Sequence, residues 1–335
     1  MGSAMIGHLW DELAQRRHMC PGLVASVAGI DFEFACSSSR TMSALEEMLV
    51  QHLGAGQSGG HRHRILIAPV RRLEQTLGAA GYAWQGALAD GTPVHVVRQG
   101  EVAEVLVGRQ ISILIDPVEA RTVCRVAPYR YDEEPQGHAV SSPRGRLLVH
   151  RPGSPAPWSY LVPLLNALLS AHGTYVLHAA GACHNGKATL MLGPSGVGKT
   201  TSVITLANMN IIAMSDDLIA IRRENGVFRA YGIVISGNTR LGKDVRMQMS
   251  APVGELLFLQ RSADGLHRTE PLTKHDAMLL ILEQSNDLSF LWRPKEWFDI
   301  AAGLSEAVPG RLWSLGRIED IGTHFLQNAS TERFA

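Results

Sequence analysis

The sequence has few charged and few aromatic residues, and neither sign of charge is in excess. Charged residues make up 19% of the 335 residues and aromatic residues 6%, while Lys+Arg and Asp+Glu are equal at 31 each. A chain without net charge has no field that favours nucleic acid or a membrane surface, so we expect neither as a partner. The 45% of hydrophobic residues nevertheless indicates a globular protein with a sizeable core.

Cysteine is also scarce, and its spacing argues against two kinds of site. The four cysteines form no C-x-x-C motif and lie far apart, at Cys20, Cys36, Cys124 and Cys183. This spacing indicates neither a zinc site nor a disulfide framework. It fits a protein of the reducing cytoplasm, which is the location we expect.

Long apolar runs are missing too. No run approaches the ~20 residues that a membrane-spanning helix needs. The longest candidate, residues 160–172, contains Pro163, Asn166 and Ser170, and it predicts a helix of the protein core. The first four residues, MGSA, resemble a cloning remnant, so they do not enter the fold prediction.

Residues 5–135 mix short β-like runs with helical stretches and hold no catalytic motif. This pattern predicts a small α/β or α+β module, for which substrate recognition is our hypothesis. Strands are predicted at residues 63–70, 93–100 and 111–116, and helices at residues 41–53 and 71–81. Residues 136–157, which are rich in proline, glycine and serine, predict a linker.

Residues 158–330 have the pattern of an α/β catalytic domain. The pair Asn225–Gly226 between two β-like runs predicts a hairpin, and HNGK at residues 184–187 predicts a second turn. The expected strands are residues 175–179, 188–192, 211–214 and 254–261, and the expected helices are residues 159–171, 199–209, 275–284 and 297–307.

A phosphate-binding loop is the strongest motif in the chain. Residues 193–200 read GPSGVGKT and match G-x-x-x-x-G-K-[ST], with an apolar run before them and a helical run after them. In such a loop backbone N–H groups point at phosphate oxygens, the lysine reaches the β- and γ-phosphates, and the hydroxyl ligates Mg²⁺. We therefore expect ATP and Mg²⁺ as cofactors, with Thr200 on the metal. The expected nucleotide-binding residues are Gly193, Pro194, Ser195, Gly196, Val197, Gly198, Lys199, Thr200 and Thr201.

Two adjacent carboxylates, Asp216 and Asp217, follow an apolar run at its carboxyl end. Parallel sheets place their ligand sites at this end of their strands. Asp216 follows Lys199 by only 17 positions, room for one helix and one strand, so we expect this strand beside the loop strand. Asp216 could then hold Mg²⁺, directly or through water, and Asp217 could accept a proton from an attacking hydroxyl. The alternative is a pair that caps a helix or forms a turn.

One histidine lies upstream of the loop, at the end of an apolar run. If this run pairs with the loop strand through the HNGK turn, His178 comes to lie at the edge of the loop. There it could ligate a metal, contact a phosphate or relay a proton. The alternative is a core or surface histidine without a functional role.

A polar loop at residues 236–246 contributes a further candidate. Its Arg240 and Lys243 could stabilise the charge of a transferred phosphoryl group. The alternative is an ordinary charged loop.

Taken in this order, His178, the loop at residues 193–200 and the pair Asp216–Asp217 resemble the HPr kinase/phosphorylase family, which shares its nucleotide-binding core with phosphoenolpyruvate carboxykinases. The resemblance covers residues 157–284. It implies a P-loop kinase core and ATP-dependent phosphorylation of a serine hydroxyl. It also implies that Lys199 binds phosphate, that Asp216 and Asp217 supply the metal ligand and the base, and that His178 lies beside them.

The chain departs from that family at two positions, Thr201 in place of glutamate and Ala179 in place of glycine. It looks more like diverged HPr kinase-related proteins that accompany peptide-modification genes, including lasso-peptide tailoring kinases. This resemblance implies that the acceptor is a serine of a precursor peptide.

Three other functions stay open at this stage. The acceptor could be a small hydroxylated metabolite, the chain could be a nucleotide hydrolase or switch, or it could bind nucleotide as a partner protein without catalysis. A hydrolase would turn over ATP without an acceptor, whereas intact Lys199, Thr200 and both aspartates favour catalysis over binding alone. A homo-oligomer is compatible with all of them.

Overall fold

The computed structural model describes residues 2–15, 19–20, 22–53, 62–70, 73, 75–77, 82–87, 92–127, 157–235, 239–242, 245–285 and 294–331. By its internal contacts the chain divides into two units. Unit 1 comprises Met1–Ala25, Asp31–Met48 and Gly54–Leu168, and unit 2 comprises Ser26–Ile30, Leu49–Leu53 and Leu169–Ala335. Of the predicted linker at residues 136–157, only residue 157 is described, and it is the first residue of a helix.

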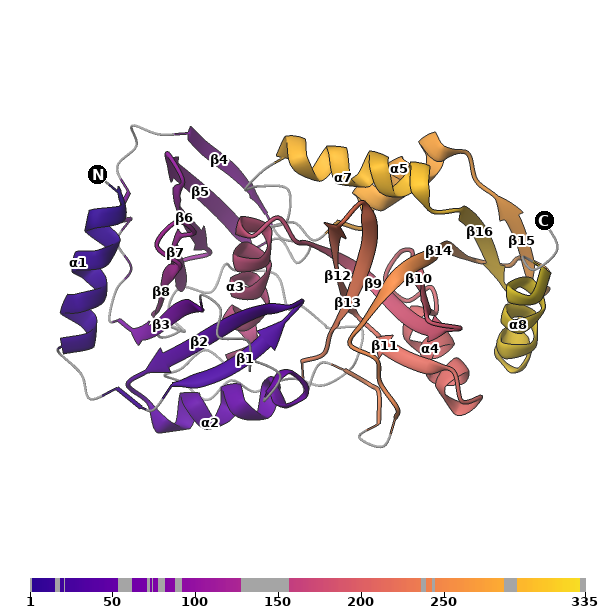
Figure 1. Ribbon diagram of the computed structural model, residues 1–335, viewed down its shortest axis with the longest axis horizontal. Coiled ribbons are helices and arrows are strands. Elements are labelled where there is room, and N and C mark those ends of the chain that lie inside the picture. Colours follow the sequence, from indigo (N-terminus) through magenta and orange to yellow (C-terminus); the bar gives the residue numbers. More distant parts are fainter. Residues whose placement is uncertain are drawn as a thin grey trace, which may run out of the picture. The chain divides into compact units, whose positions relative to one another are not determined.

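An eight-stranded sheet forms most of the first part of the chain, in the order β1-β2-β3-β8-β7-β6-β5-β4 (Figure 1). Its strands are β1 (Leu23–Val27), β2 (Ile30–Cys36), β3 (His63–Pro69), β4 (Tyr82–Ala87), β5 (Pro93–Gln99), β6 (Val102–Val107), β7 (Ile111–Asp116) and β8 (Arg121–Val126). Strands β2, β3 and β8 run parallel, whereas β4 to β8 form an antiparallel meander. The three strands predicted in this region are confirmed.

Helices α1 (Gly2–Gln15), α2 (Ser39–Met48) and the single-turn helix η1 (Val50–His52) accompany this sheet. Ile6 of α1 packs into a small core with Leu77, Val97 and Leu114, so α1 covers one face of the sheet. Residues 2–4, which the fold prediction left out, form the first turn of α1. The helix expected at residues 41–53 is confirmed in its first part as α2, followed by η1.

The helix expected at residues 71–81 is wrong where the structure describes this segment. Leu73 and residues 75–77 are not helical. The backbone N–H groups of Thr76 and Leu77 donate instead to the buried carboxylate of Glu104, at 2.7 and 2.8 Å. A side chain 27 positions away therefore takes the donors that a helix would have used, and no local pattern reports such a partner.

The second part of the chain forms another eight-stranded sheet, with β10-β9-β12-β13-β14-β16-β15 as its main path and β11 paired to β9. Its elements in chain order, after α3 (Pro157–Ala171), are β9 (Tyr175–His184), β10 (Lys187–Leu192), α4 (Lys199–Asn208), β11 (Ile212–Ser215), β12 (Leu218–Glu224), β13 (Val227–Ile233), β14 (Ser250–Arg261), β15 (Arg268–Pro271), α5 (Lys274–Glu283), α7 (Pro294–Ala307), β16 (Gly310–Leu315), η3 (Ile318–Asp320) and α8 (Ile321–Thr331). The predicted elements of this domain are confirmed to within a few residues, including both Asn-Gly hairpin turns.

Strand β10 lies between β9 and β14, antiparallel to the first and parallel to the second. Since β14 also pairs with β13, and β13 with β12, the pairings β10–β9–β12–β13–β14 close into a ring. Strand β16 extends this arrangement, parallel to β14 on its other side. The carboxyl ends of β10, β14 and β16 therefore meet at one edge.

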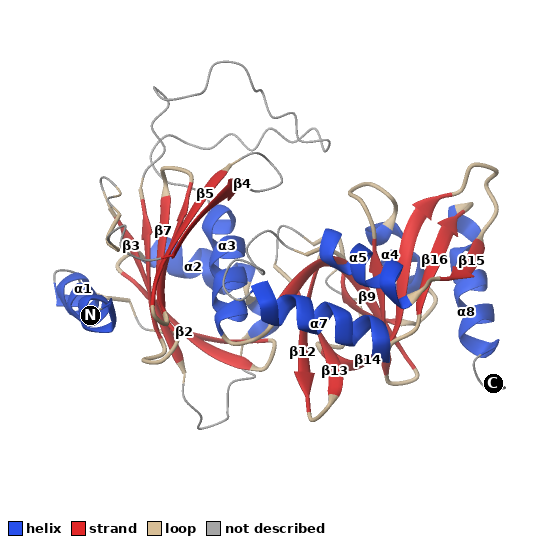
Figure 2. Cartoon of the chain, turned by 90° about the horizontal axis from the view of Figure 1, so that it is seen from above, coloured by secondary structure: helices blue, strands red, loops and turns tan. Residues whose placement is uncertain are grey.

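Helices α4, α5, α7 and α8 accompany this sheet (Figure 2). They pack against it in two separate cores. One core joins Leu190 of β10 to Ile281 of α5 and Trp297 of α7. The other joins Met191 of β10 to helices α4 and α8. Neighbouring residues of β10 thus face opposite helix pairs, as the two-residue repeat of a buried strand requires. The chain is a mixed α/β protein with two sheets, as predicted. Within the described residues, no helix has both the length and the apolar character to cross a bilayer.

Candidate functional site

The candidate site lies on one edge of β9, at the point where the strand paired with it changes from β12 to β11. On this edge His178 pairs with Leu218 of β12, and Gly181 pairs with Ser215 of β11. Strands β11 and β12 lie end to end along β9. Between them, at Asp216 and Asp217, the chain leaves the sheet. The sheet therefore presents both carboxylates at a break in its hydrogen bonding.

The expected neighbourhood of the Asp strand is wrong in one respect. Strand β11 does not lie beside the loop strand β10, because β9 lies between them and pairs with both. The expected position of His178 is confirmed: Ala179 pairs with Leu192, so the histidine lies beside the first residue of the loop. The long hairpin strand β9 is thus the element that joins histidine, loop and aspartates.

The loop after β10 curls tightly into α4. Gly193 and Gly198 have φ values of 145° and 126°, which disfavour any other residue. A Cβ atom at Gly193 would lie 2.7 Å from the carbonyl oxygen of Leu259, and one at Gly198 would lie 2.9 Å from a methyl carbon of Leu315. Both positions require glycine for conformation and for space, so this backbone is held close to the ends of β14 and β16.

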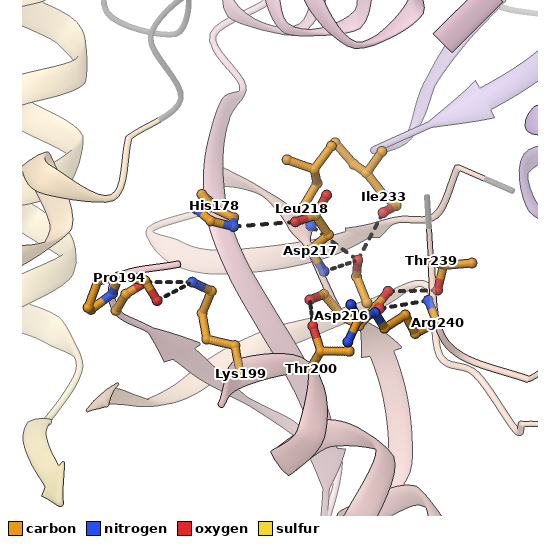
Figure 3. A network of polar contacts seen from close by, with 12 residues as sticks. His178, Pro194, Lys199, Thr200, Asp216, Asp217, Leu218, Ile233, Thr239 and Arg240 are labelled. Atoms are coloured by element: carbon orange, nitrogen blue, oxygen red, sulfur yellow. Dashed lines mark hydrogen bonds and ion pairs between the residues drawn. The ribbon is translucent and has the colours of Figure 1, made fainter. Parts of the chain in front are cut away.

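Lys199 is the first residue of α4 and its side chain turns back over the loop (Figure 3). Its Nζ donates to the carbonyl oxygens of Gly193 and Pro194, at 2.5 and 3.2 Å. Burial lowers the pKa of Lys199 to about 8, and the nearby Asp217 carboxylate opposes this shift. The ammonium group is thus still mostly charged at neutral pH.

The other loop residues lead from this turn into α4. Thr200 and Thr201 are in the first turn of α4, and Thr200 Oγ1 donates to the backbone oxygen of Asp216 at 3.2 Å. This bond places the hydroxyl between the loop and the aspartate pair. Ser195 and Gly196 are at the exposed turn of the loop, and Val197 is buried.

Asp217 and His178 face one another (Figure 3). His178 Nε2 lies 3.3 Å from Asp217 Oδ1, and the two side chains are 39% and 33% exposed. An imidazole and a carboxylate that can exchange a proton are therefore open to solvent at the edge of the loop. This pairing brings together two residues that are 39 positions apart in the chain.

Asp216 is buried and its carboxylate points away from His178 (Figure 3). Thr239 Oγ1 donates to its Oδ1 at 2.6 Å and the backbone N–H of Arg240 donates to its Oδ2 at 2.8 Å. Thr239 in turn accepts from the N–H of Leu241 at 3.0 Å. Asp216 thus ties the segment after β13 to the site.

Arg240 contributes to the site through its backbone, and its side chain is exposed. Lys243, the other cation considered in this loop, lies outside the described residues. The two aspartates and Thr239 line a small pocket with Leu218, Ile233 and Ile235.

Ser215 and Thr239 are two site residues that sequence reasoning missed. Ser215 Oγ accepts from the N–H groups of Asp217 and Leu218, both at 3.3 Å, and donates to the carbonyl oxygen of Ile233 at 2.9 Å. These hydrogen bonds of Ser215 replace backbone hydrogen bonds of the sheet that are missing between β11 and β12. A serine directly before an Asp pair is a turn-forming signal that could have indicated this role. Thr239 has no comparable local signal, because its partner is 23 positions away.

No protein-family model matches the chain, and no curated protein does. Among solved structures, the Hpr(Ser) kinase/phosphatase from Coxiella burnetii is similar, with 16% sequence identity and a TM-score of 0.30 over 48% of this chain and 99% of that chain. A TM-score this low does not establish a shared fold, so the proposal below rests on the residues of the site.

Proposed function

We propose that the chain is an ATP- and Mg²⁺-dependent kinase that transfers the γ-phosphate to a serine-type hydroxyl of a peptide or protein. The observation that carries this proposal is the pair His178–Asp217 at 3.3 Å, held beside a glycine-rich loop whose lysine lies close to the same aspartate. Phosphoryl transfer needs a phosphate cradle, positive charge and a group that orients or deprotonates the acceptor, and these residues supply all three.

The loop would hold the phosphates of ATP through its backbone N–H groups and the amino end of α4. Lys199 would exchange its bonds to Gly193 and Pro194 for bonds to the β- and γ-phosphates. With a pKa of about 8, Lys199 carries the required charge at neutral pH. A bound anion would shift this pKa.

The donors around the loop fit Mg²⁺, because they are oxygens, the ligands this ion prefers. The hydroxyl of Thr200 would hold it together with phosphate oxygens. Asp216 would reach it through water, since Thr239 and Arg240 already bind both oxygens of its carboxylate. The ion would neutralise phosphate charge during transfer.

The reaction would then need one proton acceptor. The acceptor oxygen forms a bond to the γ-phosphorus, the bond from this phosphorus to the bridging oxygen of ADP breaks, and the hydroxyl proton moves to Asp217. His178, whose Nε2 lies 3.3 Å from this carboxylate, would orient it. Asp216 is a positioning residue, since it holds residues 239–241 in place and does not face His178.

The nature of the acceptor follows from the resemblance alone. A ribosomal peptide precursor with a serine is the acceptor class we propose, and residues 5–135 would recognise it. The exposure of Asp217 and His178 is compatible with an acceptor as large as a peptide.

The test is ATP consumption by the purified full chain with Mg²⁺, with and without a library of serine-containing peptides, followed by mass spectrometry. Phosphate on a peptide serine supports the proposal and reports the preferred sequence. ATP turnover without labelled peptide favours a hydrolase, and turnover that depends on an added small hydroxyl compound favours a metabolite kinase. A chain that neither binds nor consumes ATP contradicts the proposal.

A further inference from the structure

Different residues lie on the two sides of β10, and this difference would set the orientation of a bound nucleotide. On the β9 side lie His178 and Asp217, where the γ-phosphate would have to be. In Figure 3, Pro194 of the loop lies on the opposite side of Lys199 from the two aspartates. The nucleoside end of the nucleotide must then leave the loop toward β14 and β16, which follow β10 on its other side. This step rests on the proposed function.

Two chain segments at the carboxyl ends of β14 and β16 adjoin the loop there. Arg261, the last residue of β14, donates from Nη2 to the carbonyl oxygen of Gly196 at 3.0 Å. Leu315, the last residue of β16, packs against Gly198. The residues that follow, 262–267 and 316–318, therefore begin directly beside the loop.

These two segments are bound to one another. The N–H of Ser262 donates to the carbonyl oxygen of Leu315 at 3.0 Å. His267 joins them again: its Nε2–H donates to the carbonyl oxygen of Arg317 at 2.8 Å, and its Nδ1 accepts from the N–H of Gly316 at 3.2 Å. Both ring nitrogens are used, which fixes the imidazole between the segments.

The turn at residues 262–268 is also braced internally. Asp264 accepts from Ser262 Oγ at 2.7 Å and from the N–H of Leu266 at 3.1 Å, and it pairs with Arg268. The hydrogen bond from Ser262 is the main cause that lowers the pKa of Asp264 to about 2. The carboxylate thus stays ionised and links Ser262, Leu266 and Arg268 within the turn.

Each segment presents one apolar side chain to solvent. Leu266 is 59% exposed and Ile318 is 57% exposed. Single exposed apolar residues are common on protein surfaces and need no explanation. Here, however, two of them stand on segments that are bound together, fixed in shape and joined to a phosphate-binding loop. Apolar side chains on a rigid support are what the face of a planar base requires.

We propose that Leu266 and Ile318 form the surface on which the base of the bound nucleoside triphosphate rests. Residues 262–267 and 316–318 then act as a nucleoside platform, separate from the side of the loop where the phosphate is transferred. Arg261 joins this platform to the loop at Gly196, so the two parts of the nucleotide site keep a fixed separation.

The experiment compares two ligands that share phosphates but not the base. Affinities of ATP and of inorganic tripolyphosphate are measured with Mg²⁺ by calorimetry, for the full chain and for the variants Leu266→Ser and Ile318→Ser. We expect each variant to weaken ATP about five- to tenfold, the effect of losing roughly 50 Å² of apolar contact. Tripolyphosphate should bind both variants as it binds the unchanged chain.

Leu279→Ser is the matched control, since Leu279 of α5 is also exposed, at 45%, and lies outside the platform. It should change neither affinity. ATP binding that is unaffected by both platform variants overturns this inference and leaves the proposed function standing. Equal losses for ATP and tripolyphosphate also overturn it, because they report damage to the loop. If the unchanged chain binds neither ligand, the proposed function itself fails.

Discussion

Asp216 and Asp217 are chemically identical neighbours, yet the sheet gives them different surroundings. Asp217 is a third exposed and faces His178, whereas Asp216 is buried and accepts two hydrogen bonds from residues 239 and 240. The two residues lie in the bend between β11 and β12, where one member of the pair faces His178 and the other faces inward, toward residues 239 and 240. Substitution of the two should therefore have different consequences.

For Asp217→Asn we expect phosphoryl transfer to fall at least about 100-fold, because the amide cannot accept the hydroxyl proton. ATP affinity should stay within about threefold, since the loop and Lys199 are unchanged. Phosphopeptide formation by mass spectrometry and ATP titration measure the two effects. A variant that binds ATP tightly and transfers phosphate at the full rate would rule out Asp217 as the base.

His178→Ala provides the partner to this test. The histidine would act through Asp217, so its loss should lower the rate about tenfold or more and change ATP affinity less. The two losses should not add in the double variant, because both remove the same unit. An unchanged rate would return His178 to a purely structural role.

Lys199→Ala should abolish turnover and weaken ATP and tripolyphosphate alike, because the lysine binds the phosphates that both ligands share. We expect a loss of at least about 100-fold in kcat/KM. Lys187→Ala is the control, since Lys187 is an exposed lysine at the amino end of β10, the strand that leads into the loop. Activity retained in the Lys199 variant would mean that the loop does not bind the reacting phosphates.

At the scale of elements, local signals predicted what local chemistry determines. The HNGK turn and Asn225–Gly226 demand particular turns, and both hairpins formed with the expected strands. The glycine-rich loop between β10 and α4 is equally local. The position of β11 is not determined locally. Strand β10 pairs with one edge of β9, so β11 can pair only with the other edge. No pattern in the sequence states which edge that is.

The helix predicted at residues 71–81 is wrong, at the described residues 73 and 75–77, for a related reason. Its sequence has helix-forming residues, but Glu104 of β6 takes its N–H groups. The same carboxylate accepts from Ser112 Oγ at 2.9 Å and pairs with Arg125 at 2.8 Å. At Thr76 and Leu77, a single buried side chain thus overrides the local helix propensity. Tertiary partners of this kind cannot be read from a local pattern.

This network predicts a large cost for Glu104→Gln. The substitution removes the buried negative charge that pairs with Arg125, whose side chain is only 12% exposed. We expect a loss of about 3 kcal/mol in stability, seen as a lower midpoint of urea unfolding. Glu101→Gln is the control, since Glu101 directly precedes β6, the strand that contains Glu104. Glu101 is exposed and pairs with Arg98 at 3.4 Å, so its loss should cost at most about 0.5 kcal/mol. Equal midpoints for the two variants would contradict this role of Glu104.

At the scale of the whole molecule, every described residue of the candidate site and of the platform belongs to unit 2. The sequence predicted this concentration, because all its chemical motifs follow residue 170. It did not predict that two short pieces from the first part of the chain, Ser26–Ile30 and Leu49–Leu53, would group with this unit. Neither piece carries a motif, and their membership comes from tertiary contacts, among them the hydrogen bond from the Val234 N–H to His52.

His52, in the second of these pieces, makes the stability of unit 2 depend on pH. Its ring is 2% exposed, and its Nε2 accepts from the N–H of Val234, the residue after β13, at 3.1 Å. Burial lowers the pKa of His52 from 6.5 to about 4, because a charged ring there would lose its contact with water. The unfolded chain therefore binds a proton at His52 below about pH 6.5, whereas the folded chain does not until about pH 4.

Stability should accordingly fall as the pH drops through this window, by about 2 kcal/mol between pH 6.5 and pH 5 from this one group. Urea unfolding at a series of pH values measures the slope. In His52→Gln the side chain can still accept from Val234 and cannot titrate, so the variant should lose less stability than the unchanged chain over this interval. His275→Gln, at an exposed position in α5, should keep the original slope. If His52→Gln and the unchanged chain lose stability equally between pH 6.5 and pH 5, the histidine is not the group that limits unit 2 in acid.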